Sequence, residues 1–145
     1  MIWIRQLLLI VHVASAMVWF GSTLFIARRT KSALELEGKA RTISFAELLR
    51  EARVFTSASG LVFLTGLGLA GLFGFGNLSP RYHASMTLSL IWVALDHAIV
   101  RRSLVSLASG ASDGTPEAVL KRLRVTLGVQ HLLFTVTLVL MLWRL

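Results

Sequence analysis

Residues Gln6–Ala27 read QLLLIVHVASAMVWFGSTLFIA, a run of 22 residues that contains one histidine and no formal charge. A helix needs roughly 20 mostly apolar residues to cross the ~30 Å hydrocarbon core of a bilayer. Three similar runs follow, so the sequence predicts membrane spans at residues 4–27, 54–77, 82–101 and 124–143. These runs are too long, and alternate too little, to be strands of a membrane barrel.

The overall composition also indicates a membrane protein. Hydrophobic residues make up 55% of the 145-residue chain and charged residues only 15%, whereas a soluble domain is normally about a quarter charged. The net charge of +8 comes from basic residues at the ends of the apolar runs, so we expect a lipid bilayer and no nucleic acid as partner. With no cysteine, the chain has no disulfide and no thiolate metal site.

The short loops between spans predict the fold. Consecutive membrane helices joined by short loops favour an antiparallel arrangement. We therefore predict an all-α, up-down-up-down four-helix bundle, with residues 1–145 forming a single transmembrane domain. Capping patterns place helix starts near Ser44–Glu47 and at Thr115–Pro116, and Gly76–Pro80 is predicted to be a tight turn.

The distribution of basic residues predicts the orientation. Twelve of the 15 Lys and Arg residues follow the first or third span, and the others are Arg5, Arg81 and Arg144. Because cytoplasmic loops are enriched in Lys and Arg, we expect a multi-pass protein of the inner (cytoplasmic) membrane with both termini on the outer, periplasmic side. Trp3 and Trp143 then lie at the outer interface, where aromatic residues are enriched.

The first residues also have features of a signal peptide. Met1–Ala16 contains Arg5, an apolar stretch and an Ala14-Ser15-Ala16 tripeptide that is typical of a cleavage site. The apolar run continues without a break to Ala27, however, and is long enough to span. We therefore interpret it as the first membrane helix.

All four histidines lie in or at the edge of the predicted spans, where ionisable side chains are costly and usually functional. At a rise of ~1.5 Å per residue, His12 and His83 lie roughly 24–27 Å above the inner basic boundary, and His97 and His131 roughly 6–10 Å above it. His83 and His97 are 14 residues apart and share one helix face. Two pairs of imidazoles at two depths predict one or two b-type haems with histidine ligands.

The histidines, Arg124, Asp96 and the small residues of span two can each have a functional role or an ordinary structural one. Arg124, on the same face as His131, can meet a haem propionate. Any of the histidines can instead be a hydrogen-bond partner between helices, and His83 can be solvated at the interface. Asp96 is predicted either to pair with a cytoplasmic arginine or to handle protons. A stripe of small residues in span two can be a wall for a flat macrocycle or a helix-packing face: Ser57, Gly60, Gly68, Gly71 and Gly74.

The first span carries a specific motif, His12-Val-Ala-Ser-Ala-Met-Val-Trp19-Phe-Gly21 followed by Arg28. It resembles the first helix of the superfamily that contains HemJ-type protoporphyrinogen IX oxidases and the CopD-type membrane domains of copper-resistance proteins. Thr65-Gly66-Leu67 is similar to the second helix of that pattern. The resemblance implies a b-type haem with His12 as an axial ligand, and it assigns Trp19 and Arg28 to the same site.

The chain also departs from the HemJ-type pattern. Ala27 replaces a proline, Met86 replaces a lysine, and Gly128–His131 replaces an Asn-Glu-x-Pro element, although His97 matches the histidine that ends the third helix. Because the lysine belongs to the functional signature, the resemblance does not carry over the oxidase activity. His131 is an additional histidine and favours a variant with different haem ligation.

The sequence thus predicts a haem b-binding membrane protein for electron transfer; if it is an enzyme, it is a haem-dependent oxidoreductase. Expected partners are a redox protein, a quinone or porphyrin-type small molecule, and a second copy of the chain. One alternative is a HemJ-like protoporphyrinogen IX oxidase. The other is a copper-handling protein, because imidazole and thioether groups suit Cu(I) and His12, His83, Met17 and Met86 supply both.

Overall fold

The computed structural model describes residues 2–110 and 114–142, so Trp143 and Arg144 lie outside the described residues. The described chain is helical and contains no strand, which confirms the all-α prediction. Its helices are α1 (Ile2–Leu24), α2 (Ile26–Leu34), α3 (Gly38–Phe73), α4 (Pro80–Leu95), α5 (Arg101–Ser109) and α6 (Pro116–Leu142). A 3-10 turn, η1 (Phe75–Asn77), precedes α4, and a π-helical turn, η2 (Asp96–Val100), separates α4 from α5.

Four helical segments in the described residues are long and apolar enough to cross a membrane: Ile2–Leu34, Gly38–Phe73, Pro80–Ser109 and Pro116–Leu142. They contain the described parts of the first, third and fourth predicted spans and residues 54–73 of the second, and they indicate a multi-pass membrane protein. Their outward faces are apolar. Leu7, Met17 and Leu132, for example, are each more than 60% exposed, a pattern that suits contact with lipid rather than water.

Local signals explain several of the helix ends. Pro116 begins α6, and the backbone N–H of Ala118 donates to the Thr115 hydroxyl 3.3 Å away, which confirms this predicted start. The predicted turn at Gly76–Pro80 is confirmed, because residues 76–79 lie in the connection between α3 and α4 and Pro80 begins α4. Gly74 ends α3 with φ +78°, a conformation that favours glycine. The start predicted near Ser44–Glu47 is wrong, because α3 already begins at Gly38 and continues through these residues.

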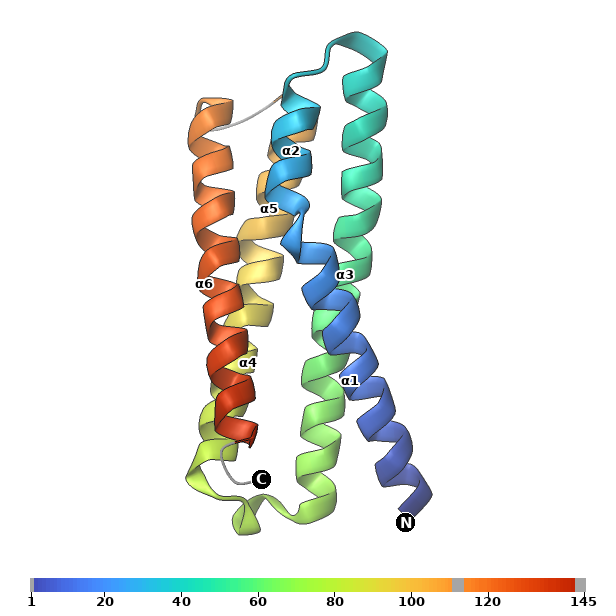
Figure 1. The fold of residues 1–145 in the computed structure, drawn as a ribbon, viewed down its shortest axis with the longest axis vertical. Helices are drawn as coiled ribbons and strands as arrows, with labels where there is room; N and C mark the ends of the chain where they lie inside the picture. The colour runs from blue at the N-terminus through green and yellow to red at the C-terminus, as the bar shows by residue number, and fades with distance from the viewer. Residues whose placement is uncertain (1, 111–113, 143–145) are drawn as a thin grey trace.

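The helices separate towards one end of the molecule. Helix α1 packs mainly along α3, and α6 packs along α4, while α2 contacts both α3 and α6. In Figure 1, α1 leans away from α4 and α6 towards the lower end, which carries the start of α1, η1 and the end of α6. We call this the lower end and the opposite one the upper end.

Aromatic side chains fill the middle of the structure. The rings of Trp19 and Trp92 have centroids 4.4 Å apart, and Phe134 stacks on Trp92 with centroids 5.0 Å apart. Phe20 stacks in turn on Phe134 at 5.2 Å. This aromatic cluster (Trp19, Phe20, Trp92 and Phe134) brings α1, α4 and α6 together above the region where the helices separate.

Candidate cofactor site

An apolar cavity of about 420 Å³ lies near the lower end, between α1, α3, α4 and α6. This volume is within the range of about 300–1,000 Å³ that is usual for small-molecule and cofactor sites. Most of the lining is aliphatic or aromatic, including Phe63 and Leu67 of α3. Among the four histidines, His12 is the one that lines it.

The hydrogen bonds of His12 determine which ring nitrogen is free. Its Nδ1 lies 2.9 Å from the carbonyl oxygen of Val62 and 3.1 Å from the hydroxyl oxygen of Thr65. A carbonyl oxygen can only accept, so Nδ1 carries the proton and donates it. The lone pair of Nε2 is then available. Histidines that bind metals almost always show this arrangement, in which the other nitrogen donates to a carbonyl or carboxylate.

Gly66 makes room for the His12 ring. A Cβ atom built on Gly66 would lie 3.2 Å from Cε1 and 3.6 Å from Nδ1 of His12. The distance of 3.2 Å is shorter than most real contacts of a Cβ atom, so the imidazole lies directly against the α3 backbone. The predicted stripe from Ser57 to Gly74 is not the cavity wall, because Gly66 lies on the opposite face of the helix.

Two methionines from other helices line the same cavity. Met86 comes from α4 and Met141 from α6, so an imidazole and two thioethers share one apolar space. No group of three or more His, Cys, Asp or Glu residues suited to a metal occurs within residues 2–110 and 114–142. The nitrogen and sulfur donors that line the cavity are therefore those of His12, Met86 and Met141.

Two arginines lie against aromatic residues of the cavity wall. The guanidinium carbon of Arg5 is 4.6 Å from the ring centroid of Phe73, and that of Arg81 is 5.7 Å from the ring centroid of Tyr82. Both rings line the cavity. Two cations thus lie beside residues of the cavity wall, although neither arginine lines the cavity itself.

The other three histidines lie elsewhere. His83 is exposed on α4, and His97 is exposed with its Nδ1 3.0 Å from the carbonyl oxygen of Val93 in its own helix. His131 is half-buried, and its Nε2 lies 3.0 Å from the hydroxyl oxygen of Thr23 on α1. None of the three lines the cavity that contains His12. Their assignment as haem ligands stays a prediction.

The structure gives Asp96 a different environment from the predicted ion pair. Its carboxyl group is fully buried and accepts hydrogen bonds from Nε1 of Trp19 at 2.6 Å and from Nε2 of Gln130 at 2.7 Å. The prediction of an arginine partner is wrong, because the indole and the amide occupy the two carboxyl oxygens. Asp96 begins the π-helical turn η2, and such turns often occur at functional positions in helices.

The remaining predicted residues are spread over the molecule. Trp19 is fully buried and belongs to the Asp96 network. Arg28 and Arg124 are both exposed, and neither lines the cavity that contains His12. The contact of Arg124 with a haem propionate and the assignment of Arg28 to the haem site stay predictions.

Sequence reasoning missed residues in the cavity, beside it and in the Asp96 network. It assigned no role to Met141, and it counted Arg5 only as a residue of the outer side. A signal for Arg5 was present, because seven residues separate it from His12 and residues at that spacing share a helix face. It also missed Gln130 as the partner of Asp96, because 34 residues separate the two.

No protein-family model, curated protein or solved structure matches this chain. The resemblance to the HemJ and CopD superfamily therefore rests on the motif from His12 to Arg28 and stays a prediction. The function has to be argued from the cavity itself.

Proposed function

We propose that the chain is an up-down-up-down bundle in the cytoplasmic membrane, with its lower end on the outer side. Twelve of the 15 basic residues lie at the upper ends of the predicted spans or in the segments that join these ends, which supports this orientation. The lower end carries Arg5 and Arg81. In this orientation the cavity that contains His12 lies in the outer half of the membrane.

We further propose that this cavity binds one haem b, with Nε2 of His12 as an axial ligand, and that the protein is a membrane electron-transfer protein. The observation that carries the proposal is the geometry of His12. Its Nδ1 is held by Val62 and Thr65, and its free Nε2 belongs to a residue that lines an apolar cavity of about 420 Å³. A bound haem supplies one-electron redox chemistry.

The protein's own residues would hold and tune such a cofactor. Met86 and Met141 are the candidates for a second ligand, and pairing of methionine with histidine raises the reduction potential of a haem. Arg5 and Arg81 would meet the propionate carboxylates, because arginine is suited to carboxylate recognition. The aliphatic and aromatic lining would exclude water from the macrocycle.

A single haem fits the geometry better than the predicted pair. His97 is exposed and engaged within its own helix, and His131 packs against α1. The two-haem arrangement requires these residues to act as ligands together. The outer site, in contrast, needs only groups that already line one cavity.

Copper handling is the second candidate, and the two methionines favour it. Thioether and imidazole donors suit Cu(I), and Met86, Met141 and His12 line one cavity. The copper path predicted from sequence also included Met17 and His83. Neither residue lines the cavity, and Met17 is 71% exposed.

An absorption spectrum of the purified protein separates these functions. The haem proposal predicts a Soret band and one haem per chain in a pyridine haemochrome assay. His12→Ala should lose the haem or change it to a high-spin form, while the matched variant His83→Ala keeps both spectrum and stoichiometry. A protein without a Soret band that retains Cu(I) would support copper handling. A spectrum unchanged by His12→Ala would contradict the ligand assignment.

Haem that remains bound through purification would be a cofactor, because a substrate or product would be released. A HemJ-like oxidase would in addition convert added protoporphyrinogen IX. Met86 stands where the lysine of that functional signature is expected, so we predict no such conversion.

A further inference from the structure

A groove follows the contact between α1 and α3 towards the upper end, away from the haem cavity. It consists of two hollows of about 500 Å³ and about 470 Å³. Val54 lines both, so they adjoin. The upper hollow lies at the junction of α1 and α2, where Phe25 interrupts the helix. The lower hollow extends along α1 to Ala14.

Arginines are concentrated in the upper part of this groove. Arg28 and Arg29 line the upper hollow, and Arg53 lines the lower one close to Val54. A single acidic residue, Glu51, lines the groove among the described residues. The upper part of the groove is therefore basic.

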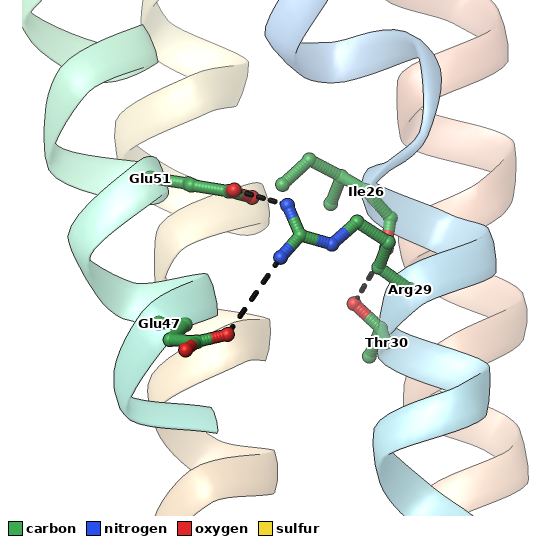
Figure 2. Close-up of polar contacts among 5 residues, drawn as sticks. All are labelled: Ile26, Arg29, Thr30, Glu47 and Glu51. Atoms are coloured by element: carbon green, nitrogen blue, oxygen red, sulfur yellow. Dashed lines mark hydrogen bonds and ion pairs between the residues drawn. The ribbon is translucent and has the colours of Figure 1, made fainter. Parts of the chain in front are cut away.

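The charge of Arg29 is already compensated. Figure 2 shows its guanidinium between two carboxylates of α3, with Nη1 bonded to Glu51 and Nη2 4.0 Å from Glu47. The neighbouring Thr30 hydroxyl donates to the carbonyl oxygen of Ile26 at 2.7 Å. In residues 2–110 and 114–142 no ion pair involves Arg28 or Arg53. These two cations remain available to a ligand.

The rest of the groove is apolar and exposed. Val18, Val54 and Leu61 are each about half exposed, and Ala14 and Ser57 are small residues beside them. From Arg28 to Ala14 the helix rises roughly 21 Å at ~1.5 Å per residue. One leaflet of the hydrocarbon core is about half of ~30 Å thick, so the groove is long enough for one acyl chain.

We propose that this groove binds one anionic phospholipid of the inner leaflet. Its phosphate contacts Arg28 and Arg53, and one acyl chain lies along Val18 and Leu61. Basic pockets between membrane helices on the cytoplasmic side are suited to anionic headgroups. The polar and apolar parts of the groove follow the same order as the parts of a lipid. This site is separate from the haem cavity and does not depend on haem.

The test is retention of lipid by protein released from nanodiscs that contain equal amounts of phosphatidylglycerol and phosphatidylcholine with identical acyl chains. Native mass spectrometry then counts each lipid on the released protein. Wild type should retain phosphatidylglycerol in preference to phosphatidylcholine. Arg28→Gln and Arg53→Gln should each reduce this preference about fivefold. The matched control Arg101→Gln, an exposed cation at the end of the third predicted span, should leave it unchanged.

A second variant tests the apolar half without altering charge. Ser57→Phe places a ring in the groove and should reduce the amount of retained phosphatidylglycerol, whereas Thr87→Phe on the exposed face of α4 should not. Equal retention of both lipids by wild type would overturn the proposal. The proposal would also be overturned if Arg101→Gln reduced the preference for phosphatidylglycerol as much as Arg28→Gln does. Anionic lipid would then be attracted by the basic residues in general and not by this groove.

Discussion

Asp96 and His12 are two polar side chains inside the helix bundle that differ in how many of their polar atoms have hydrogen-bond partners. The carboxyl group of Asp96 accepts hydrogen bonds from Trp19 and Gln130 and is fully enclosed. His12 uses one nitrogen for Val62 and Thr65, and its other nitrogen belongs to a half-buried ring at a cavity. The first arrangement uses both carboxyl oxygens to join three helices. The second leaves the lone pair of Nε2 without a partner in a residue that lines the cavity, so this nitrogen is available to bind a metal.

The difference indicates a structural role for Asp96 and supports the ligand-binding role that we propose for His12. An enclosed polar group with all its partners fixes the register of the helices that provide them. Trp19 belongs to α1, Asp96 follows α4, and Gln130 belongs to α6, so this network holds the bundle closed where the helices begin to separate. Variants at the two positions should therefore affect different properties.

The largest expected effect on stability is at Asp96. Asp96→Ala leaves the Trp19 indole without its acceptor and removes one acceptor of the Gln130 amide, which keeps its bond to the carbonyl oxygen of Trp92. We expect the free energy of unfolding in detergent to fall by about 3 kcal/mol. Asp96→Asn keeps one acceptor oxygen and should lose about half as much. Haem content per folded chain should stay at the wild-type value in both. Loss of haem from folded Asp96→Asn would contradict the claim that Asp96 contributes to stability and not to haem binding.

A smaller effect is expected at Gly66, which touches the His12 ring. Gly66→Ala adds a methyl group 3.2 Å from Cε1 of His12 and should displace the imidazole. We expect haem affinity to fall about tenfold, corresponding to about 1.4 kcal/mol, with little change in unfolding. Gly60→Ala is the matched control, because nothing lies within 4 Å of a Cβ atom at that position. Equal haem affinity in the two variants would contradict the placement of the ring.

The next effect concerns the reduction potential rather than the affinity. If Met86 is the second ligand, Met86→Leu should lower the potential, because methionine raises it relative to other ligands. Met141→Leu tests the other candidate in the same potentiometric titration. A change in one variant identifies the ligand. Unchanged potentials in both would show that neither sulfur binds the iron.

The smallest effect is expected at the upper histidines. His97→Ala and His131→Ala should each leave the haem stoichiometry at one per chain, since neither residue lines the cavity. His131→Ala should still lose its contact with Thr23 and some stability. A wild-type stoichiometry of two that falls to one in both variants would restore the two-haem prediction.

The parts that sequence predicted correctly depend on local signals. Four apolar runs of span length determine four long helices, and the proline at position 116 determines a helix start. Among the four predicted histidine ligands, His12 lines the cavity, and its role as a haem ligand stays a prediction. Length, hydropathy and capping are all properties of neighbouring residues.

The missed parts depend on how the helices are placed relative to one another. Trp19 and Asp96 are 77 residues apart, and the helical period of either segment does not reveal which faces meet. The π-helical turn at Asp96 further changes the helical phase, so a wheel drawn with a regular period cannot locate its partners. The role of Gly66 was missed for the same reason, because the conspicuous glycines lie on the other face of α3.

We propose above all that Nε2 of His12 binds the iron of a haem in the outer half of the membrane. Replacement of the His12 side chain by free imidazole tests this most directly. His12→Gly removes the imidazole and leaves space that added imidazole can enter. We predict that the variant, supplied with haem, is high-spin or empty, and that added imidazole restores the wild-type absorption spectrum. A variant whose spectrum already equals that of wild type without imidazole would contradict the claim.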